Sequence, residues 1–574
     1  MIYKRGLTSF LVAITTLIFT TTPSWAENPP RKIFTGWIPY YSKTGLSSAV
    51  VNADLIEEVS PFWYSLTGET KILDQYATGN PSVPISVPIA TLRSMNFKII
   101  PTITDGTAKG VLARLLASNT SRTNIISTIV TLVNQYNYDG IDLDFENFAF
   151  LDGNTTWPIT APLWVQFVKE LSQTLHAQGK ILSITSPVAF DPATGKRGYY
   201  VYSWPEIAQY IDRLRIMTYD FSVAKPGPIG PINWTEDAVK YAISVMPASK
   251  VFVGLAGYGR DWITKVDGIC PADVASAIKV GAKAATFVMR DALNLAASYG
   301  VTPTWDATSG ENTFSYQKTY IGNTSAGLAT QCTASRTAWY MDAKSYALRT
   351  NLVAKYRLGG VAEWTLGMED QTAAQTIRDI AKNIAPDVVN AKIATDTDSG
   401  MLGDLISLNG AFSLPDTTPL IGLPVRVESK NALTDWHPIF SGLTGTDGSI
   451  SIKSKFGENT SLRVVSDGTW ERLASQSQVK EIKISKLISW SAPSSMRQGV
   501  SYSIKGQIQP KSSDQKVKLF INGVKSAETL TDADGRFTIP LIYDKLGIIS
   551  VQLNLDGDSR FAESSAKLTQ ILVR

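Results

Sequence analysis

The feature that most constrains the fold of this chain is a repeated alternation of strand-like and helical segments between residues 33 and 383. The helical segments carry apolar residues at the spacing of one helix face, as at Trp164, Phe167 and Leu171. Strands that alternate with helices pair in parallel through right-handed crossovers, and eight such units fit a closed barrel. We therefore predict an α/β fold, with a (β/α)8 TIM barrel over residues 30–384. The eight predicted strands span residues 33–37, 59–65, 98–104, 140–146, 181–187, 213–219, 251–255 and 360–365.

The connection between the seventh and eighth predicted strands is too long for a barrel loop, because roughly a hundred residues separate Leu255 from Gly360. We predict an α+β subdomain inserted at residues 263–345. It contains the two cysteines of the chain, Cys270 and Cys332. In an exported protein, a lone pair of cysteines is expected to form a disulfide.

The first 26 residues have the pattern of a signal peptide. Lys4 and Arg5 precede an apolar stretch at residues 7–19, and residues 24–26 form a small-x-small cleavage site. A membrane anchor is the weaker alternative, because threonines interrupt the apolar stretch, which is short for a bilayer span. We expect a secreted, extracellular protein whose mature chain carries no membrane span.

Charge and histidine content argue against several functions. Without Lys4 and Arg5, 52 basic residues remain against 50 acidic ones, and no basic block is present, so we expect no nucleic-acid partner. The two histidines, His176 and His437, are too far apart to suggest a Ser-His-Asp triad or a zinc site. We expect no metal and no cofactor. The 14 Trp and 22 Tyr residues suit a protein that stacks aromatic rings on sugars.

The sequence changes character after residue 384. Residues 385–402 are rich in Asp, Thr and Gly and predict a linker. Short alternating strands follow, and Asp447-Gly448 and Asp534-Gly535 mark matching turns 87 residues apart. Repeats of this length predict two immunoglobulin-like β-sandwiches, at residues 403–485 and 486–574. Their expected role is that of a spacer or of modules that contact the cell wall.

The strongest chemical feature is a row of acids at the end of the fourth predicted strand. Asp142, Asp144 and Glu146 alternate with apolar residues. Alternate residues of a strand face the same side, so the three carboxyl groups are expected to point into the barrel and rise to its C-terminal rim. Crowded, partly buried carboxyl groups cannot all ionise, so at least one pKa is raised and one group stays protonated as an acid.

Two other interpretations of this row are weaker. A solvated acidic loop would not interleave its acids with apolar residues at a strict period of two. A calcium or magnesium site usually draws its ligands from a flexible loop and not from a straight strand. Acid–base chemistry is therefore the favoured interpretation.

The run from Asp139 to Glu146 resembles the Asp-x-x-Asp-x-Asp-x-Glu signature of glycoside hydrolase family 18, the chitinase-like family. Three further segments resemble motifs of that family in the same order: residues 217–220, 254–260 and 359–364. The resemblance extends over about 350 residues.

The resemblance implies a substrate-assisted mechanism with retention of configuration, an exception to the two-carboxylate rule of glycosidases. Glu146 would protonate the glycosidic oxygen and later activate water. The nucleophile would be the carbonyl oxygen of the sugar's own 2-acetamido group. Asp144 would orient the acetamido N–H, Asp142 would share a proton with Asp144, and Tyr219 would hydrogen-bond the acetamido oxygen.

The resemblance also implies a substrate-binding set. Trp364 would form the apolar floor under the sugar, and Met217 would line the acetamido pocket. The remaining members would hold hydroxyls and neighbouring rings or, for Thr102, support the inner aspartate; they are Asp220, Tyr258, Arg260 and Thr102. Arg260 is alternatively a structural ion-pair partner. Where the family often has a tyrosine, this chain has Trp37, so we expect Tyr40 or Tyr41 to supply that contact.

We therefore expect a secreted glycosidase that cleaves β-1,4 bonds of N-acetylglucosamine polymers, either chitin or peptidoglycan. Residues 59–65 and 145–147 resemble the bacterial branch that acts on peptidoglycan, including spore-cortex hydrolases. The alternative is a chitinase-like lectin on the cell surface that binds glycan without cleaving it. Such lectins usually lack the acid that Glu146 represents.

Overall fold

The computed structural model describes residues 29–574, so the predicted signal peptide at residues 1–26 lies outside the described residues. Eight parallel strands follow one another in the order β1-β15-β9-β8-β7-β6-β5-β2, and β1 also pairs with β2. This pairing closes the sheet and confirms the predicted (β/α)8 barrel. The strands are β1 (Phe34–Pro39), β2 (Glu58–Gly68), β5 (Thr102–Asp105), β6 (Gly140–Asp144), β7 (Ile181–Pro187), β8 (Arg213–Met217), β9 (Val251–Ala256) and β15 (Gly360–Trp364).

The third strand is broken where one continuous strand was predicted. β4 (Lys98–Ile99) and β5 both pair in parallel with β2, and Pro101 lies between them. Proline lacks the N–H that a continuous ladder requires, which explains the break. A short strand, β3 (Lys71–Asp74), adds an antiparallel hairpin to the far end of β2.

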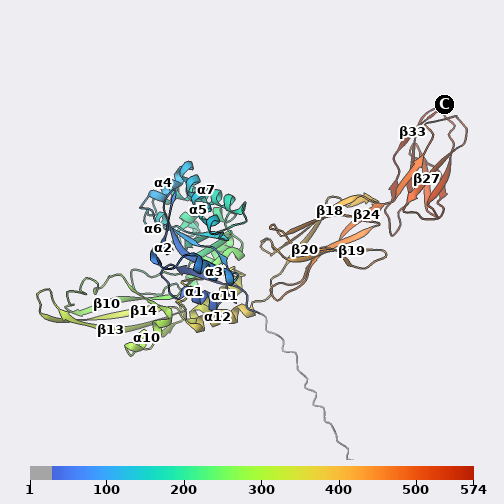
Figure 1. The fold of residues 1–574 in the computed structure, drawn as a ribbon. Helices are drawn as coiled ribbons and strands as arrows, with labels where there is room; N and C mark the ends of the chain where they lie inside the picture. Colours follow the sequence, from blue (N-terminus) through green and yellow to red (C-terminus); the bar gives the residue numbers. More distant parts are fainter. Residues whose placement is uncertain (1–28) are drawn as a thin grey trace, which may run out of the picture.

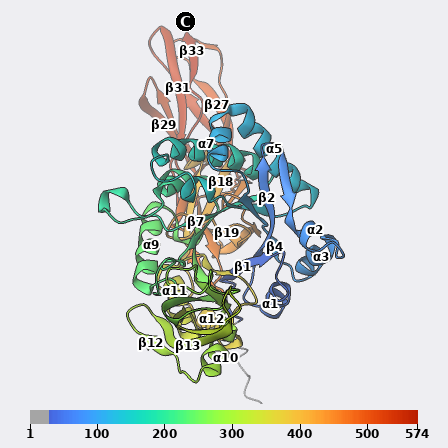
Figure 2. The same ribbon diagram turned by 90° about the vertical axis from the view of Figure 1, so that its left-hand side faces the viewer.

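Helices surround the barrel and bury one apolar face each against its strands, as Val168 and Leu171 of α7 do. Figure 2 looks along the barrel, with α5, α7 and α9 outside the strands. The helices of this layer are α1 (Gly45–Val51), α2 (Gln75–Gly79), α3 (Ser86–Ser94), α4 (Val111–Ala117), α5 (Asn119–Gln135), α6 (Asn147–Phe150), α7 (Trp157–His176), α8 (Trp204–Ile207), α9 (Ile232–Val245), α11 (Ala343–Tyr356) and α12 (Gln371–Asn383).

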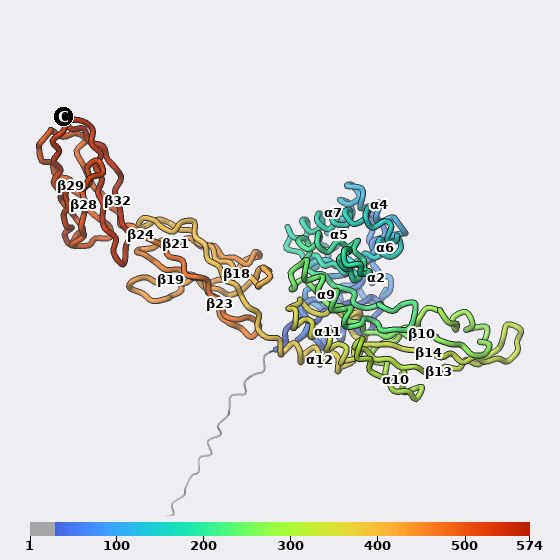
Figure 3. Tube along the Cα trace, turned by 180° about the vertical axis from the view of Figure 1, so that it is seen from behind, coloured from blue at the N-terminus to red at the C-terminus, as the bar shows by residue number. Residues whose placement is uncertain are grey.

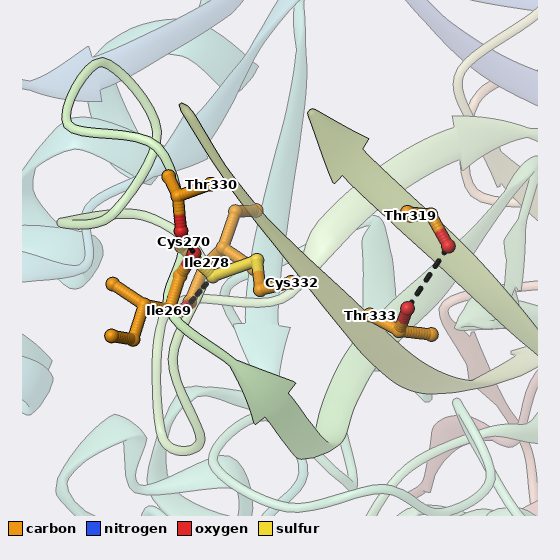
Figure 4. The surroundings of a disulfide bond; sticks show 7 residues. All are labelled: Ile269, Cys270, Ile278, Thr319, Thr330, Cys332 and Thr333. Carbon is orange, nitrogen blue, oxygen red and sulfur yellow. Dashed lines mark hydrogen bonds between the residues drawn. A yellow bond between two sulfur atoms is a disulfide. The ribbon is translucent and has the colours of Figure 1, made fainter. Parts of the chain in front are cut away.

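An α+β insertion separates β9 from β15, and Figure 1 shows it projecting away from the barrel. Its antiparallel sheet has the order β11-β10-β14-β13-β12, and it begins earlier than residue 263, where we predicted the insertion to start. Cys270 and Cys332 form a disulfide in this subdomain (Figure 4), as predicted. Its elements are β10 (Tyr258–Gly268), β11 (Ala285–Val288), α10 (Ala292–Ser298), β12 (Thr304–Asp306), β13 (Glu311–Asn323) and β14 (Ala329–Tyr340).

Two β-sandwiches follow the barrel and share one topology. Sheets β16-β18-β21 and β17-β24-β22-β19-β20 form the first, and β25-β27-β30 and β26-β33-β31-β28-β29 form the second. Two of these strands lie in the segment that we expected to be a linker, residues 385–402. The repeat is therefore confirmed in its β-sheet architecture, whereas the immunoglobulin-like classification stays a prediction. The strands are β16 (Asn390–Thr395), β17 (Ser399–Met401), β18 (Leu405–Ser413), β19 (Pro424–Asn431), β20 (His437–Leu443), β21 (Ser449–Lys455), β22 (Thr460–Ser466), β23 (Ser475–Gln476), β24 (Lys480–Ser485), β25 (Leu487–Ser491), β26 (Ser495–Met496), β27 (Tyr502–Gln509), β28 (Lys516–Ile521), β29 (Val524–Leu530), β30 (Arg536–Leu541), β31 (Gly547–Leu555), β32 (Ser564–Ser565) and β33 (Thr569–Val573).

The sandwiches extend in a row from the side of the barrel opposite the insertion (Figures 1 and 3). Arg31, just before the barrel, pairs with Asp387 at 2.9 Å, next to the first sandwich. Phe561 of the second sandwich is buried in the core of the first. No helix within residues 29–574 combines the length and the apolar character needed to cross a membrane.

Candidate functional site

The acid row of β6 has its apolar neighbours on the outside of the barrel. The Phe145 ring lies 6.3 Å from the ring of Trp164 and 6.2 Å from that of Phe167, both on α7. Because side chains alternate along a strand, Asp142 and Asp144 point into the barrel instead. The two aspartates and the apolar residues therefore lie on opposite sides of β6.

Asp142 is fully buried and surrounded by donors. Its Oδ1 accepts hydrogen bonds from Ser183 at 2.6 Å and Thr185 at 3.1 Å. Its Oδ2 accepts from the hydroxyl of Thr102 at 2.7 Å and from the indole N–H of Trp37 at 3.3 Å. Asp142 therefore accepts a hydrogen bond in each of these contacts.

A buried cation lies beneath Asp142. The Nη1 atom of Arg215 is 3.8 Å from Asp142 Oδ2, and its Nη2 is 3.0 Å from Glu58 Oε1. Arg213 pairs with the other oxygen of Glu58 at 3.1 Å. Burial acts to raise the pKa of Glu58, but the two arginines outweigh it and hold that pKa below its usual value.

Asp144 and Glu146 form a coupled pair at the mouth of the barrel. Burial raises the pKa of Asp144 well above its usual value, and the charges of Glu146 and Asp142 raise it further. Burial also raises the pKa of Glu146. The two carboxyl groups interact with each other, so the ionisation of one affects that of the other.

The sharing of a proton between Asp142 and Asp144 stays a prediction. Donors surround Asp142, whereas the Oδ1 atom of Asp144 is buried without a hydrogen-bond partner among the described residues.

Tyr219 follows β8 and lies beside this pair. Burial raises its pKa well above the usual value, and the neighbouring Tyr258 and the charge of Asp144 add to the effect, so its hydroxyl stays protonated and can donate. Gly254 on β9 makes room for the ring. A Cβ at that position would lie 2.9 Å from Tyr219 Cε1 and 2.4 Å from the carbonyl oxygen of Ile216.

Asp220, Tyr258 and Arg260 form a polar cluster next to Tyr219. The Tyr258 hydroxyl donates to Asp220, and Arg260 donates to the two Asp220 oxygens, at 2.7 Å each, through Nη2. Arg260 is thus engaged in an ion pair, the alternative that the sequence left open. The cluster fixes the rim where the insertion leaves the barrel.

Trp364 ends β15 and is half-buried. Its ring centroid lies 5.8 Å from that of Trp37 and 4.9 Å from that of Phe62. Met217 is also half-buried, against the barrel core. Trp37 itself contacts Asp142, so neither Tyr40 nor Tyr41 supplies that contact, and Tyr41 is 56% exposed.

Sequence reasoning missed four residues around Asp142. Their shared signal is a polar side chain at alternate positions of a buried strand, as at Ser183 and Thr185, which marks an inward-facing polar row. The four are Glu58, Ser183, Thr185 and Arg215. Within residues 29–574, no group of three or more His, Cys, Asp or Glu side chains is arranged to hold a metal ion.

A cavity of about 540 Å³ is lined by Phe221, the residue after Asp220, but not by Asp220, Tyr258 or Arg260. Three aromatic side chains contribute to its wall: Phe190 after β7, Phe221 after β8, and Trp234 of α9. Aromatic walls of this kind suit sugar rings, which stack on them through their apolar faces.

Comparison with known proteins adds an independent finding. The family model described as "Glycosyl hydrolases family 18" matches residues 62–369. The "Cortical fragment-lytic enzyme" of Bacillus subtilis (strain 168) is 24% identical over 300 residues, which cover 50% of this chain and 61% of that protein. "Chitinase A1" of Niallia circulans is 25% identical over 306 residues, or 47% of this chain and 40% of that protein. Among solved structures, a chitinase from Chromobacterium violaceum ATCC 12472 is 22% identical with a TM-score of 0.48, and the match covers 60% of this chain and 98% of that one.

The similarity to curated relatives is partial in length. The chain spans between 32% and 68% of the length of the curated proteins that it matches. The residues that the family model matches include the acid row, Tyr219, the cluster of Asp220, Tyr258 and Arg260, and Trp364.

Proposed function

The chain belongs to glycosyl hydrolase family 18, and from that premise we propose that it is a retaining glycoside hydrolase acting on β-1,4 bonds of polymers that contain N-acetylglucosamine. The observation that carries the proposal is the pair of Asp144 and Glu146 at the mouth of the barrel, where burial raises the pKa of both carboxyl groups. A raised pKa favours the protonated carboxyl group that an acid catalyst requires.

Glu146 is the acid in this proposal. It lies two residues after the end of β6, where it is only partly buried and can reach a bound sugar. It donates its proton to the glycosidic oxygen as the bond breaks. In the second step it takes a proton from the attacking water.

The nucleophile is the carbonyl oxygen of the sugar's 2-acetamido group, which attacks the anomeric carbon and forms an oxazolinium ion. The unpartnered Oδ1 of Asp144 accepts the acetamido N–H. The protonated hydroxyl of Tyr219 donates to the acetamido oxygen. Together they hold the nucleophile in line, so orientation and charge stabilisation supply much of the rate.

Trp364 and Met217 form the apolar part of the same sugar site. The half-buried indole of Trp364 leaves surface on which a sugar ring stacks. Asp220, Tyr258 and Arg260 bind hydroxyls at the rim, and Thr102 supports Asp142 from below.

We favour peptidoglycan over chitin as the polymer. Residues 59–65 and 145–147 resemble the branch that acts on peptidoglycan, and the curated cortical fragment-lytic enzyme matches 50% of this chain, against 47% for the curated chitinase. We further propose that the protein is exported. The Cys270–Cys332 disulfide supports export, because such bonds persist in oxidising compartments. The sandwiches then act as a spacer or as contacts to the cell wall.

The test compares the wild-type chain with Glu146→Gln on purified sacculi and on colloidal chitin. We expect sugar release by the wild type, faster from sacculi, and loss of release in the variant with unchanged thermal unfolding. The control is Glu206→Gln, an exposed glutamate of α8, which should keep full activity. Glycan binding by the wild type without any product would support a lectin, and full turnover by Glu146→Gln would refute the mechanism.

A further inference from the structure

The backbone of Glu146 lies beyond the parallel strand pairing of the barrel. The last residue of β6 is Asp144, which pairs with Thr104 of β5, and the pairing with β7 ends at Leu143. Glu146 is already the residue that precedes α6, with a φ of −110° and a ψ of −24°. Strand pairing therefore fixes the two inner acids of the row, whereas the position of Glu146 depends on contacts that its neighbours in the chain make.

Tyr202 holds the peptide unit directly before Glu146. It ends the 3-10 helix η2 (Tyr200–Tyr202), which lies in the connection between β7 and β8. Its hydroxyl donates a hydrogen bond of 2.7 Å to the carbonyl oxygen of Phe145, and both residues are fully buried. Because a peptide unit is planar, the direction of that carbonyl fixes the direction of the N–Cα bond of Glu146. The contact therefore reaches the acid through one rigid unit.

A buried aromatic cluster holds Tyr202 itself in place. The centroid of its ring lies 5.0 Å from that of Phe148 on α6 and 6.0 Å from that of Trp164 on α7. The indole N–H of Trp164 also donates to the carbonyl oxygen of Tyr202 at 3.2 Å. All three side chains are completely buried, and close packing leaves such rings little freedom to move. The Tyr202 hydroxyl is therefore preorganised, and burial raises its pKa well above the usual value, so that it stays a donor.

The chain on the other side of Glu146 is anchored as well. The side-chain amide of Asn147 donates to the carbonyl oxygen of Asp105, at the end of β5, at 3.1 Å and to that of Thr107 at 2.7 Å. The carbonyl oxygen of Glu146 accepts the N–H of Ala149 at 2.9 Å in the first turn of α6. Removal of the tyrosine hydroxyl would therefore free only the peptide unit before Glu146 and leave the rest of the loop in place.

We propose that Tyr202 is a positioning residue for the acid: its hydroxyl holds the Phe145 carbonyl and thereby aims the Glu146 carboxyl group at the glycosidic oxygen. This inference rests on the proposed function. A proton passes from an acid to its acceptor only at hydrogen-bond distance, so the acid must be placed accurately. A displacement of about 1 Å can slow a reaction about 100-fold. Because Tyr202 is completely buried, it acts through Glu146 and not on the sugar.

The test uses Tyr202→Phe in the full chain, because phenylalanine removes the hydroxyl and keeps the ring in its aromatic cluster. Tyr64→Phe is the matched control, since Tyr64 is also buried and its hydroxyl hydrogen-bonds to that of Tyr138 at 2.8 Å. Two substrates separate proton donation from the rest of the reaction. The trisaccharide of N-acetylglucosamine loses a sugar, which needs a proton, whereas the dinitrophenyl glycoside of the disaccharide loses dinitrophenolate, which needs none. Thermal unfolding is followed in parallel.

We expect kcat of Tyr202→Phe for the trisaccharide to fall about tenfold with KM within about twofold of the wild type, while the first burst of dinitrophenolate keeps its wild-type rate. Tyr64→Phe should keep both rates. An unchanged kcat for the trisaccharide would overturn the proposal, as would equal losses on the two substrates or an equal loss in Tyr64→Phe.

If the wild type cleaves neither substrate, the proposed function fails, and crystal structures then decide on the positioning role. A Glu146 side chain in the same place in the wild type and in Tyr202→Phe would overturn that role. A displaced carboxyl group in the variant would support it.

Discussion

Arg215 is the residue whose removal tests the electrostatics of the site most informatively. It is fully buried, 3.8 Å from Asp142 and 3.0 Å from Glu58. At an effective dielectric constant of about 20, a pair of unit charges at that first distance interacts by about 4 kcal/mol.

Arg215→Met removes a cation that lowers the pKa of Glu58, so that pKa should rise. The stability that comes from a lowered carboxyl pKa is present at neutral pH and is lost as pH falls. We therefore expect the variant to lose about 3–5 kcal/mol of stability at neutral pH from breaking a buried ion pair, and less at acid pH.

The assay is thermal unfolding of the wild type and the variant from neutral to acid pH. Arg213→Met is the matched comparison, because Arg213 pairs with the same Glu58 at 3.1 Å but its side chain is 23% exposed. It should lose less stability than Arg215→Met. A folded Arg215→Met protein with the stability of the wild type, or with a loss no larger than that of Arg213→Met, would refute the reasoning.

Three further outcomes are expected. Tyr219→Phe should lower kcat about 100-fold with little change in KM, because it removes one hydrogen-bond donor to the transition state. Steady-state kinetics measure this loss, and an unchanged kcat would contradict the role of the Tyr219 hydroxyl. Asp220→Asn removes a negative charge that raises the pKa of Glu146, so the alkaline limb should move to lower pH; a shift to higher pH would contradict the assignment. Burial and the charge of Glu369 raise the pKa of Glu363 well above its usual value. A carboxyl group with a raised pKa stabilises the fold at low pH, and this stability is lost as pH rises through the raised pKa. The melting temperature of the wild type should therefore fall relative to that of Glu363→Gln as pH increases. Melting temperatures that change in parallel would exclude the effect.

Sequence periodicity was sufficient for the barrel and for the placement of the acid row. Strict alternation fixes which side chains of β6 enter the barrel, Asp142 and Asp144 among them, whereas Glu146 lies after the strand, at the start of α6. The alternation did not predict which residues of other strands contact these acids. Ser183 and Arg215 lie on other strands, and their approach to Asp142 depends on the barrel register, which local sequence does not contain.

The first sandwich shows a second limit. Residues 390–395 form β16, although their composition suggested a linker. Only Ala391 and Ile393 of this strand turn toward the core, so its apolar pattern is too weak to be recognised alone. Pairing with β18 supplies the hydrogen bonds that hold it as a strand.

The most direct test of the central claim measures how the loss of cleavage rate in Glu146→Gln depends on the leaving group of the substrate. A dinitrophenyl disaccharide needs no proton for departure, whereas a sugar leaving group does. We predict a first burst of dinitrophenolate from the variant at nearly the wild-type rate, with cleavage of the trisaccharide slowed by about 10²–10⁴-fold. Equal losses with both leaving groups, or none with the trisaccharide, would contradict proton donation by Glu146.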